Sequence, residues 1–599
     1  LNGNAEYEIL DGLKAKAMLG YYFGLQELEN QEYKFNLYAY DEKTGEYYVT
    51  DRMTNPYRER NRDRVEDLTS NIQLNYDKKF GKHAINVVAG FEATKRNRPK
   101  MWIHSTPTSD AMDLIRLNEI VEFNDTGKGT EARMGYLARV NYNYADRYLV
   151  EFIGRWDGSW KFRPGHRWGF FPSASLGWRL SEENFWKENK IGEIVTNLKI
   201  RASYGEVGDD NVSNYSPYDF LPGYTYNNGG AVIDGEWVVG SATRGLPNET
   251  LSWLTAKILD IGIDLGFLNN RLNAQVDFFQ RKREGLPAQR YDVLIPVEAG
   301  FSLPQENLNS DMHRGFDASI SWSDNINDFH YSIGANMTYS RFWDWEQYKP
   351  RFSNSWHEYR NSIWHRVGYV NWGYEAIGRF ESWEQIANYP IDNDRKGNRT
   401  VVPGDIMYKD QNGDGVINGY DERPIGYRVD STPTLNYGIN LSASWKGFDL
   451  AMDWTGSGMT SWWQRYETAR PFQNDGNNPS EVLTDAWHLS DPFDPDSELI
   501  PGKYPMLRLP SDETSAYDSS TYWLHNVRYI KLRNLEFGYT LPKSWLTHTG
   551  ITNVRVYLSA TNLLTISNIK SLMDPECASD NGLDYPPMRV INLGVNLKF

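Results

Sequence analysis

Pairs of alternating segments joined by very short turns constrain the fold of this chain more than any other feature. In residues 434–445 (TLNYGINLSASW) every second side chain is apolar, as in a β-strand with two different faces. The dipeptide Lys446-Gly447 then gives a tight turn, and FDLAMDW continues the alternation with Asp449 and Asp453 on the second face. Because burying two carboxylates in a dry core is costly, we expect that second face to contact water.

The same pattern recurs along the chain and predicts about seventeen antiparallel strands. The final strand, RVINLGVNLKF, places apolar residues from Ile591 to Phe599 on one face. An odd number of strands cannot close an even-stranded barrel, so we expect further strands upstream. The other predicted two-residue turns are Asp11-Gly12, Gly81-Lys82, Ala145-Asp146 and Asn269-Asn270.

At their other ends the strands are joined by long polar connections. Short turns on one side and long loops on the other are typical of a bacterial outer-membrane barrel, and less so of a soluble sandwich or propeller. Aromatic residues make up 14% of the chain, with 39 Tyr and 22 Trp, and favour strands and interfacial girdles. The predicted long loops, on the extracellular side, lie near 23–65, 96–130, 208–250, 284–311, 341–431, 458–524 and 564–586.

Composition excludes several classes of protein. The formal net charge of −16 argues against nucleic acid as a partner. The mean hydropathy is −0.65 and no run of 18 apolar residues occurs, so a transmembrane helix is excluded while a transmembrane β-barrel is not. The single cysteine, Cys577, excludes a disulfide framework. The chain opens in strand-like sequence without Met or a signal peptide, and we expect it to start inside a larger protein.

Several blocks, in this order and spacing, resemble the SusC/RagA-like TonB-dependent transporters of Bacteroidetes outer membranes. A C-terminal aromatic residue, here Phe599, is a further point of similarity. The blocks are DRYLVEFIGRWDGSWKF, RWGFFPSASLGWRLSEENF, NLKIRASYGEVGDDN, LDIGIDLGFLNNRLNAQVDFF, GDIMYKDQNGDGVINGYDERPIG, YIKLRNLEFGYTLPKSWL, LSATNLLTIS and MDPE.

The resemblance implies an outer-membrane barrel of about 22 strands with a plug that this chain does not contain. It also implies import driven by the TonB complex, through the absent N-terminal part, together with a SusD-like surface lipoprotein that captures ligand. Most members of the family import oligosaccharides and some import oligopeptides. We therefore expect a barrel that contacts outer-membrane lipid and imports a glycan, with oligopeptide import as the alternative.

Residues 409–421 (KDQNGDGVINGYD) match the calcium-loop pattern D-x-[DN]-x-[DN]-G-x5-E except at the last position, where Asp replaces Glu. The flanking sequence shows no helical period, so a structural Ca²⁺ site is expected rather than a calcium sensor. The alternative is a turn of Asx and Gly residues without a metal. The predicted ligands are Asp410, Asn412, Asp414, the Val416 carbonyl, Asn418 and Asp421.

Four tryptophans in predicted loops are candidates for ligand contact: Trp343, Trp345, Trp462 and Trp463. Flat aromatic rings suit the apolar faces of sugars, while neighbouring acids and amides can bind the hydroxyls. The alternative is that these rings pack loop against loop or against a partner protein.

Enzymatic motifs are missing from the sequence. WHEYRN lacks the second His of H-E-x-x-H because Asn361 occupies that position, and there is no G-x-S-x-G or phosphate-binding loop. With 79 acidic residues, a glycosidase pair cannot be identified from sequence. We expect no enzyme, although a soluble glycan-binding or glycan-cleaving β-protein and a structural outer-membrane adhesin remain alternatives.

Overall fold

The protein is described by a computed structural model in which strands dominate and all helices are short. None of the helices in the described part of the chain has the length and apolar character needed to span a membrane. The described residues are 1–54, 56–109, 111, 113–127, 129–211, 218–429, 432–473, 480–509, 513–547, 550–577 and 581–599.

The chain divides into two compact units. Unit 1 comprises Leu1–Trp178, Ser203–Ile258 and Arg283–Asn309, and unit 2 comprises Arg179–Ala202, Leu259–Lys282 and Ser310–Phe599. Five strands contribute residues to both units: β11 (Trp168–Arg179), β12 (Val195–Asp209), β15 (Leu254–Phe267), β16 (Leu272–Ala288) and β17 (Glu306–Ile326).

In unit 1, seven long strands pair with one another in sequence order, each antiparallel to the next. Two shorter strands, β7 (Lys100–Ser105) and β8 (Ile120–Asp125), add to this array through β5. The seven strands are β1 (Asn2–Leu10), β2 (Leu13–Gln31), β5 (Arg58–Phe80), β6 (His83–Asn97), β9 (Glu131–Tyr144), β10 (Tyr148–Ser159) and β11 (Trp168–Arg179).

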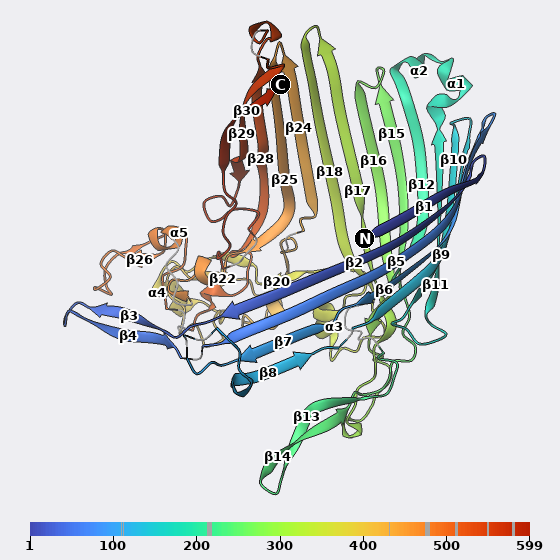
Figure 1. Ribbon diagram of the computed structural model, residues 1–599. Helices are drawn as coiled ribbons and strands as arrows, with labels where there is room; N and C mark the ends of the chain where they lie inside the picture. The colour runs from blue at the N-terminus through green and yellow to red at the C-terminus, as the bar shows by residue number, and fades with distance from the viewer. Residues whose placement is uncertain are drawn as a thin grey trace. The chain divides into compact units, whose positions relative to one another are not determined.

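Unit 2 contains a second run of seven long antiparallel strands. In Figure 1 those from β24 onward lie side by side in the orange and red part of the chain. The strands are β17 (Glu306–Ile326), β18 (Phe329–Glu346), β24 (Leu435–Trp445), β25 (Phe448–Trp463), β28 (Leu524–Thr540), β29 (Asn553–Ser567) and β30 (Val590–Lys598).

The connections carry the remaining elements. The short strands are β3 (Phe35–Asp41), β4 (Glu46–Met53), β13 (Tyr224–Ile233), β14 (Glu236–Thr243), β19 (Arg366–Val367), β20 (Asn371–Gly373), β21 (Ala376–Arg379), β22 (Ile406–Tyr408), β23 (Arg423–Ile425), β26 (His488–Leu489) and β27 (Leu499–Ile500). The α-helices are α1 (Asn184–Lys187), α2 (Lys190–Ile194), α3 (Ser355–Asn361), α4 (Trp383–Asn388) and α5 (Ser480–Thr484). The 3₁₀ turns are η1 (Leu117–Glu119), η2 (Leu180–Glu182), η3 (Val297–Ala299), η4 (Gly419–Asp421), η5 (Tyr466–Thr468), η7 (Ser515–Tyr517) and η8 (Lys543–Trp545).

The predicted all-β fold with one large antiparallel sheet is confirmed. Within the described residues, twenty strands belong to one sheet. Three of them, β7, β8 and β19, are only two to six residues long, and the other seventeen match the predicted number.

The tight turns lie where the sequence predicts them. Ala145 and Asp146 have φ of 55° and 57°, and Asn269 and Asn270 have φ of 58° and 61°, so both pairs have left-handed backbone. The first pair lies in a three-residue loop, because Tyr144 pairs with Tyr148, and the second lies in the four-residue connection between β15 and β16. Gly81-Lys82 and Lys446-Gly447 are two-residue turns. Short hairpin turns with left-handed backbone match the right-handed twist of the strands that they join. These turns therefore fix the register of the long hairpins.

The two faces of the strands differ as the alternation predicts. Along β30, the apolar residues Ile591, Leu593, Val595 and Leu597 are between 51% and 78% exposed. On the polar face of the strands, the carboxylate of Asp453 in β25 accepts a hydrogen bond from Asn440 Nδ2 in β24 at 2.6 Å. An apolar outer face beside a polar one is the arrangement of strands that contact lipid on one side only.

Several long connections are shorter than predicted because the strands extend further. β2 continues to Gln31 and β5 begins at Arg58, so the first connection is 32–57 rather than 23–65. Likewise, β16 ends at Ala288 and β17 begins at Glu306. Alternation alone did not reveal these ends, because polar residues occupy both faces of the strands there. Parts of the predicted loops, including 212–217 and 474–479, lie outside the described residues.

The exposed apolar face allows a direct test of lipid contact. We predict that Leu74→Arg on β5, where Leu74 is 48% exposed, destabilises the folded protein by about 2–4 kcal/mol, because it places a cation in hydrocarbon. Gln73→Arg, on the other face of the same strand, is the control and should change stability little. The stability of both variants is measured by unfolding in lipid vesicles, followed by heat-dependent gel mobility. Equal destabilisation by the two substitutions would contradict lipid contact at Leu74.

Candidate functional site

Two long connections of unit 2 fold on a shared hydrophobic core, which we call the loop core. The connection between β18 and β24 contributes Ile406, Tyr408 and Ile417, all with 0% exposure. The connection between β25 and β28 contributes Tyr504 and Trp523, which are 1% and 2% exposed. A core of this kind gives the two connections a fixed structure that polar loops otherwise lack.

Buried polar groups join the same two connections. The side chain of Asn393, which is fully buried, donates to the carbonyl of Ile406 at 3.0 Å in its own connection and to the Ser515 hydroxyl at 3.3 Å in the other connection. The carboxylate of Asp405 forms an ion pair with Arg508, and both side chains are largely buried. Satisfied buried groups of this kind specify one arrangement of the connections, because leaving any of them unpaired is costly.

The predicted calcium-binding loop, residues 409–421, lies in this assembly and its conformation is fixed by its own acids. Gly413 and Gly415 have φ of 76° and 83°, which residues with a β-carbon rarely adopt. The two carboxylate oxygens of Asp410 accept from the amides of these glycines at 2.7 and 2.8 Å. The carboxylate of Asp414 accepts from the amide of Val416 at 2.9 Å, which contributes most to lowering the pKa of Asp414.

Three carboxylates converge within the loop. One oxygen each of Asp410, Asp414 and Asp421 can be chosen so that all three lie within 4.8 Å of one another. Asp421 is fully buried, and its oxygens accept from the amides of Gln411 at 2.9 Å and Asn418 at 2.8 Å. Like charges at this separation repel, and a cation between them removes the repulsion. Carboxylate and carbonyl oxygens are the ligands that Ca²⁺ prefers, so the donor set fits this ion.

The other predicted ligands surround the same three carboxylates. The side chain of Asn412 accepts from the amide of Asp414 and donates to its carboxylate, both at 2.9 Å. The carbonyl of Val416 accepts from the side-chain amide of Asn418 at 3.1 Å. The fold therefore brings all six predicted ligands into one loop.

The loop is attached to the segment that precedes it. The amide of Asp392 donates to the carbonyl of Gly415 at 2.8 Å, and the amide of Ile417 donates to the carbonyl of Asp392 at 2.9 Å. Because Ile417 belongs to the loop core, any ion that orders 409–421 also stabilises the core.

A neighbouring carboxylate, that of Asp394, is satisfied without an ion. It accepts from the amides of Lys396, Asn398 and Thr400 and from the Thr400 hydroxyl, at 2.7 to 2.8 Å. Burial by itself would raise the pKa of Asp394, but the bonds from Thr400 and Lys396 lower it to about 2. Asp394 therefore contributes hydrogen bonds to loop structure and lies outside the cluster of three carboxylates.

The four predicted ligand-contact tryptophans are all packed against other side chains. Trp462 and Trp463 are only 3% and 6% exposed, and Trp463 has the Arg465 guanidinium 3.9 Å from its ring centre. Trp343 lies beneath Arg314, 4.6 Å away, and Trp345 stacks on His365 with ring centres 4.2 Å apart. All four tryptophans lie on strands, Trp343 and Trp345 in β18 and Trp462 and Trp463 in β25, and not in the loops that the sequence predicts. Ligand contact at these residues stays a prediction.

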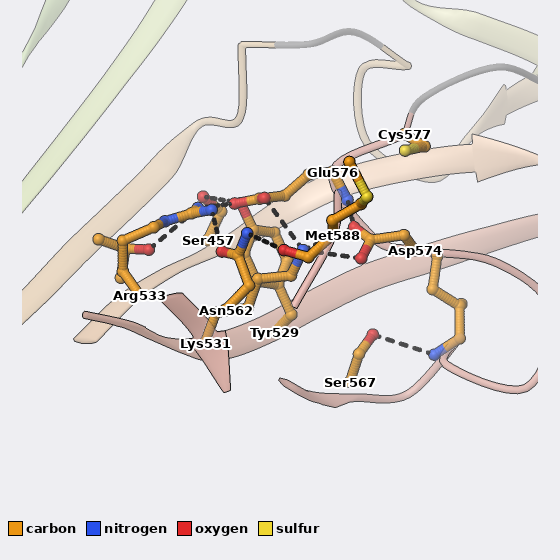
Figure 2. Close-up of polar contacts among 12 residues, drawn as sticks. Ser457, Tyr529, Lys531, Arg533, Asn562, Ser567, Asp574, Glu576, Cys577 and Met588 are labelled. Atoms are coloured by element: carbon orange, nitrogen blue, oxygen red, sulfur yellow. Dashed lines mark hydrogen bonds and ion pairs between the residues drawn. The ribbon is translucent and has the colours of Figure 1, made fainter. Parts of the chain in front are cut away.

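A second polar centre, not identified from the sequence, joins β28 to the connection that follows β29 (Figure 2). The ammonium group of Lys531, whose residue is fully buried, contacts both oxygens of Asp574 at 2.6 and 2.9 Å and Glu576 at 3.0 Å. Arg533 forms an ion pair with the other oxygen of Glu576 and donates to Asn562 at 2.8 Å. We call these four charged residues the ion cluster.

The ion cluster was missed because its members lie about forty residues apart in sequence. Asp574 and Glu576 stand in the MDPE block, whose acids carry no local sign of a partner. The available signal was a lysine and an arginine two residues apart in YIKLRNLEF, which predicts that both face the polar side of a strand. Burial by itself would raise the pKa of Glu576, but Arg533 and Lys531 lower it, so Glu576 is ionised at neutral pH.

Taken together, the strands define an antiparallel β-barrel protein of the outer-membrane type, with long structured connections. The chain belongs to the family described as "TonB dependent receptor-like, beta-barrel", whose sequence profile matches residues 1–563. The predicted membership in the SusC/RagA-like group of these proteins is confirmed, and with it the barrel fold and the outer-membrane location.

Individual relatives agree with this assignment. The chain is 29% identical to the TonB-dependent receptor P3 of Formosa agariphila, over all of the chain and 58% of that protein. It is 28% identical to the TonB-dependent receptor SusC of Bacteroides thetaiotaomicron, over 89% of the chain and 50% of that protein. The chain spans about half the length of the curated relatives that it matches.

The solved structure of the RagAB peptide importer in its open-open state has the same fold. It matches with a TM-score of 0.75 and 23% identity, over 100% of this chain and 60% of that chain. At this identity the likeness establishes the fold and leaves the ligand open.

The ion cluster makes a strong prediction about stability. Removing the ammonium in Lys531→Met leaves two carboxylates facing each other, and breaking a buried pair of this kind costs about 3–5 kcal/mol. We therefore expect much faster amide hydrogen exchange in residues 568–577 and a lower melting temperature.

The matched control is Lys14→Met, which removes an ion pair to Glu6 between side chains that are each 45% exposed. Because water screens such pairs, this variant should exchange and melt like the wild type. Hydrogen exchange in Lys531→Met that matches the control would show that the ion cluster does not hold the 568–577 segment.

Proposed function

We propose that the protein imports an oligosaccharide across the outer membrane as the barrel portion of a TonB-dependent transporter. Membership in the TonB-dependent receptor-like family supports a transport function, and the structured connections of unit 2 offer a large surface for ligand. In this proposal the TonB complex supplies the energy for import, and a SusD-like surface lipoprotein captures the ligand.

An exposed face of tyrosines carries the preference for a glycan. In the β3–β4 hairpin, Tyr40 pairs with Tyr47 and their ring centres lie 5.1 Å apart. Tyr38 lies two residues before Tyr40 and shares its face. Tyr38 is 58% exposed, Tyr40 is 53% exposed and Tyr47 is 73% exposed. Flat rings that also carry hydroxyl groups suit the apolar faces and hydroxyls of sugars.

A second exposed hairpin supports the lipoprotein partner. In β13–β14, Tyr226, Val232 and Trp237 are 81%, 67% and 64% exposed. A two-stranded hairpin is marginally stable when no other surface covers it, and a large exposed apolar patch marks an interaction site. A protein that sits over these connections would provide the missing cover.

We also propose that residues 409–421 bind a structural Ca²⁺ ion. Asp410, Asp414 and the buried Asp421 would supply carboxylate oxygens, and the Val416 carbonyl and the side chains of Asn412 and Asn418 would complete the shell, directly or through water. Outside the cell Ca²⁺ is abundant, so even a dissociation constant of roughly 10⁻⁴–10⁻³ M would suffice. The ion would hold the loop against Asp392 and the loop core.

Calcium binding is tested by its effect on stability. Wild-type protein should melt at a higher temperature with millimolar Ca²⁺ than with a chelator, because a ligand that binds only the folded state stabilises it. Asp414→Asn should remove most of that difference and abolish binding of radioactive Ca²⁺ in equilibrium dialysis.

The control for this experiment is Asp394→Asn, since Asp394 is satisfied by hydrogen bonds from the protein. It should lower the melting temperature by the same amount with calcium and with chelator. If the wild type melts identically under both conditions and binds no Ca²⁺ in dialysis, residues 409–421 form a metal-free turn.

Import is tested with cells that depend on this protein for uptake. Energy-dependent uptake should be seen with neutral oligosaccharides and not with peptides. Tyr38→Ala/Tyr47→Ala should weaken apparent affinity roughly fivefold to 150-fold, since each of the two lost aromatic contacts contributes about 0.5–1.5 kcal/mol. Tyr48→Ala, on the opposite face of the hairpin, is the control and should have little effect. Uptake of peptides alone would establish the oligopeptide alternative instead.

A further inference from the structure

A pocket of about 270 Å³ lies between β24, β25, β28 and the connection that follows β29. One part of its wall is apolar and consists of Trp462, Val527 and Ile569, each at most 3% exposed. Another part carries the side chains of Asn436, Ser457 and Tyr529. Clefts for drug-sized ligands measure about 300–1,000 Å³, so this pocket has room for a single ring.

Hydroxyl and amide groups form a connected chain along the polar part of the wall (Figure 2 shows Ser457 and Tyr529). The Ser457 hydroxyl donates to Asn436 Oδ1 at 2.8 Å, and its oxygen lies 3.4 Å from the Tyr529 hydroxyl oxygen. The Tyr529 hydroxyl donates to Glu576 Oε1 at 3.2 Å. Hydroxyls both donate and accept, so this wall can match the vicinal hydroxyls of a sugar.

The charges around the pocket balance one another. Glu576, which lines the pocket, accepts from Lys531 and Arg533, and Lys531 also contacts Asp574. Two cations therefore face two carboxylates in the ion cluster. A ligand with a net charge would disturb this balance and would have to be desolvated, whereas a neutral ligand would not.

Irregular strand pairing occurs in the strands that contribute to the pocket. The register of β25 and β28 shifts between Ser457 and Thr460, where Met459 has φ of 55°. A second shift, near Leu532, occurs in the pairing of β28 with β29, where Asn562 has φ of 53°. Bulges re-aim side chains next to binding sites, and left-handed backbone at residues other than glycine costs free energy that a function can explain.

The wall formed by the last connection is firmly attached. Asn568 accepts from the amide of Arg528 at 3.0 Å and donates to the carbonyl of Asn526 at 2.6 Å. The ion cluster then fixes Asp574 and Glu576 on either side of Pro575. The pocket is therefore built by contacts between residues that are distant in sequence, and it does not result from a loosely packed loop.

We propose that this pocket is a subsite for one neutral sugar ring, which rests on the proposed import of oligosaccharides. The ring would pack on the apolar wall near Trp462, and its hydroxyls would bond with Ser457, Asn436 and Tyr529. Sugar-binding sites commonly combine these two features, with an apolar surface on one side of the ring and a few polar groups on the other.

The single cysteine of the chain gives a local readout, because Cys577 lines the pocket and is partly exposed. We would measure the alkylation rate of Cys577 by a maleimide in the full-length protein, with Cys577→Ser as the blank for any other thiol. Glucose, galactose, mannose and fucose are the neutral probes, glucuronate is the charged probe, and a tripeptide is the non-sugar probe.

At least one neutral sugar should slow alkylation in a saturable way, and glucuronate and the tripeptide should not. Tyr529→Phe and Ser457→Ala should each raise the half-protecting concentration roughly two- to tenfold, the effect of one lost hydrogen bond. Tyr331→Phe is the control, because Tyr331 does not line this pocket. The hydroxyl of Tyr331 in β18 accepts instead from the indole N–H of Trp322 in β17.

Three results would overturn the proposal: no protection by any neutral sugar, equal protection by glucuronate or the tripeptide, or protection that Tyr529→Phe leaves unchanged. Any of these together with normal oligosaccharide uptake by cells would refute the subsite and leave the proposed import intact. Uptake of peptides alone would refute glycan import whatever the alkylation experiment shows.

Discussion

The pairing of every strand backbone with its neighbours is the constraint on which the rest of this structure depends. In lipid no water is available to bond an exposed N–H or C=O, so a membrane wall made of strands must satisfy each of these groups within the sheet. Long antiparallel strands with short turns meet that requirement, and the turns hold the register. Once the register is fixed, successive residues alternate between the lipid-facing side and the polar side of the sheet. A chain with a low mean hydropathy can therefore span a membrane with strands.

The connections obey a different constraint because they stand in water. Each must bury enough apolar surface or form enough ion pairs to offset the conformational entropy that is lost when a long polar segment is ordered. In unit 2 the two longest connections do so with a shared hydrophobic core, the buried Asp405–Arg508 ion pair and the acidic loop 409–421. The ion cluster around Lys531 does the same for the last connection. In the proposed function, this structured surface would recognise the ligand.

Local patterns predicted much of this fold. Alternation and turn residues such as Ala145-Asp146 and Asn269-Asn270 gave the strands, their faces and their number, because period and turn geometry are properties of adjacent residues. The acidic loop 409–421 could also be predicted from a local pattern, since all six candidate ligands lie within twelve positions of the sequence. The proposed tyrosine face and sugar pocket were not predicted, because strand alternation does not show which loop residues remain exposed.

Features that depend on distant contacts could not be predicted. Trp462 and Trp463 stand in a polar stretch of sequence, yet long-range packing buries both. Lys531 meets Asp574 across 43 positions, and the bulges near Ser457 and Asn562 shift the register in ways that alternation does not show. Loop boundaries were misplaced for a related reason, since strands such as β2 and β5 continue beyond the apolar alternation.

The most direct test is a cryo-EM structure of the full-length protein, purified from its native outer membrane with its ligand retained. We predict density for an oligosaccharide against the connections of unit 2, with one ring in the pocket beside Ser457 and Tyr529. Peptide density against those connections, with no sugar in the pocket, would contradict the central claim that this protein imports a glycan.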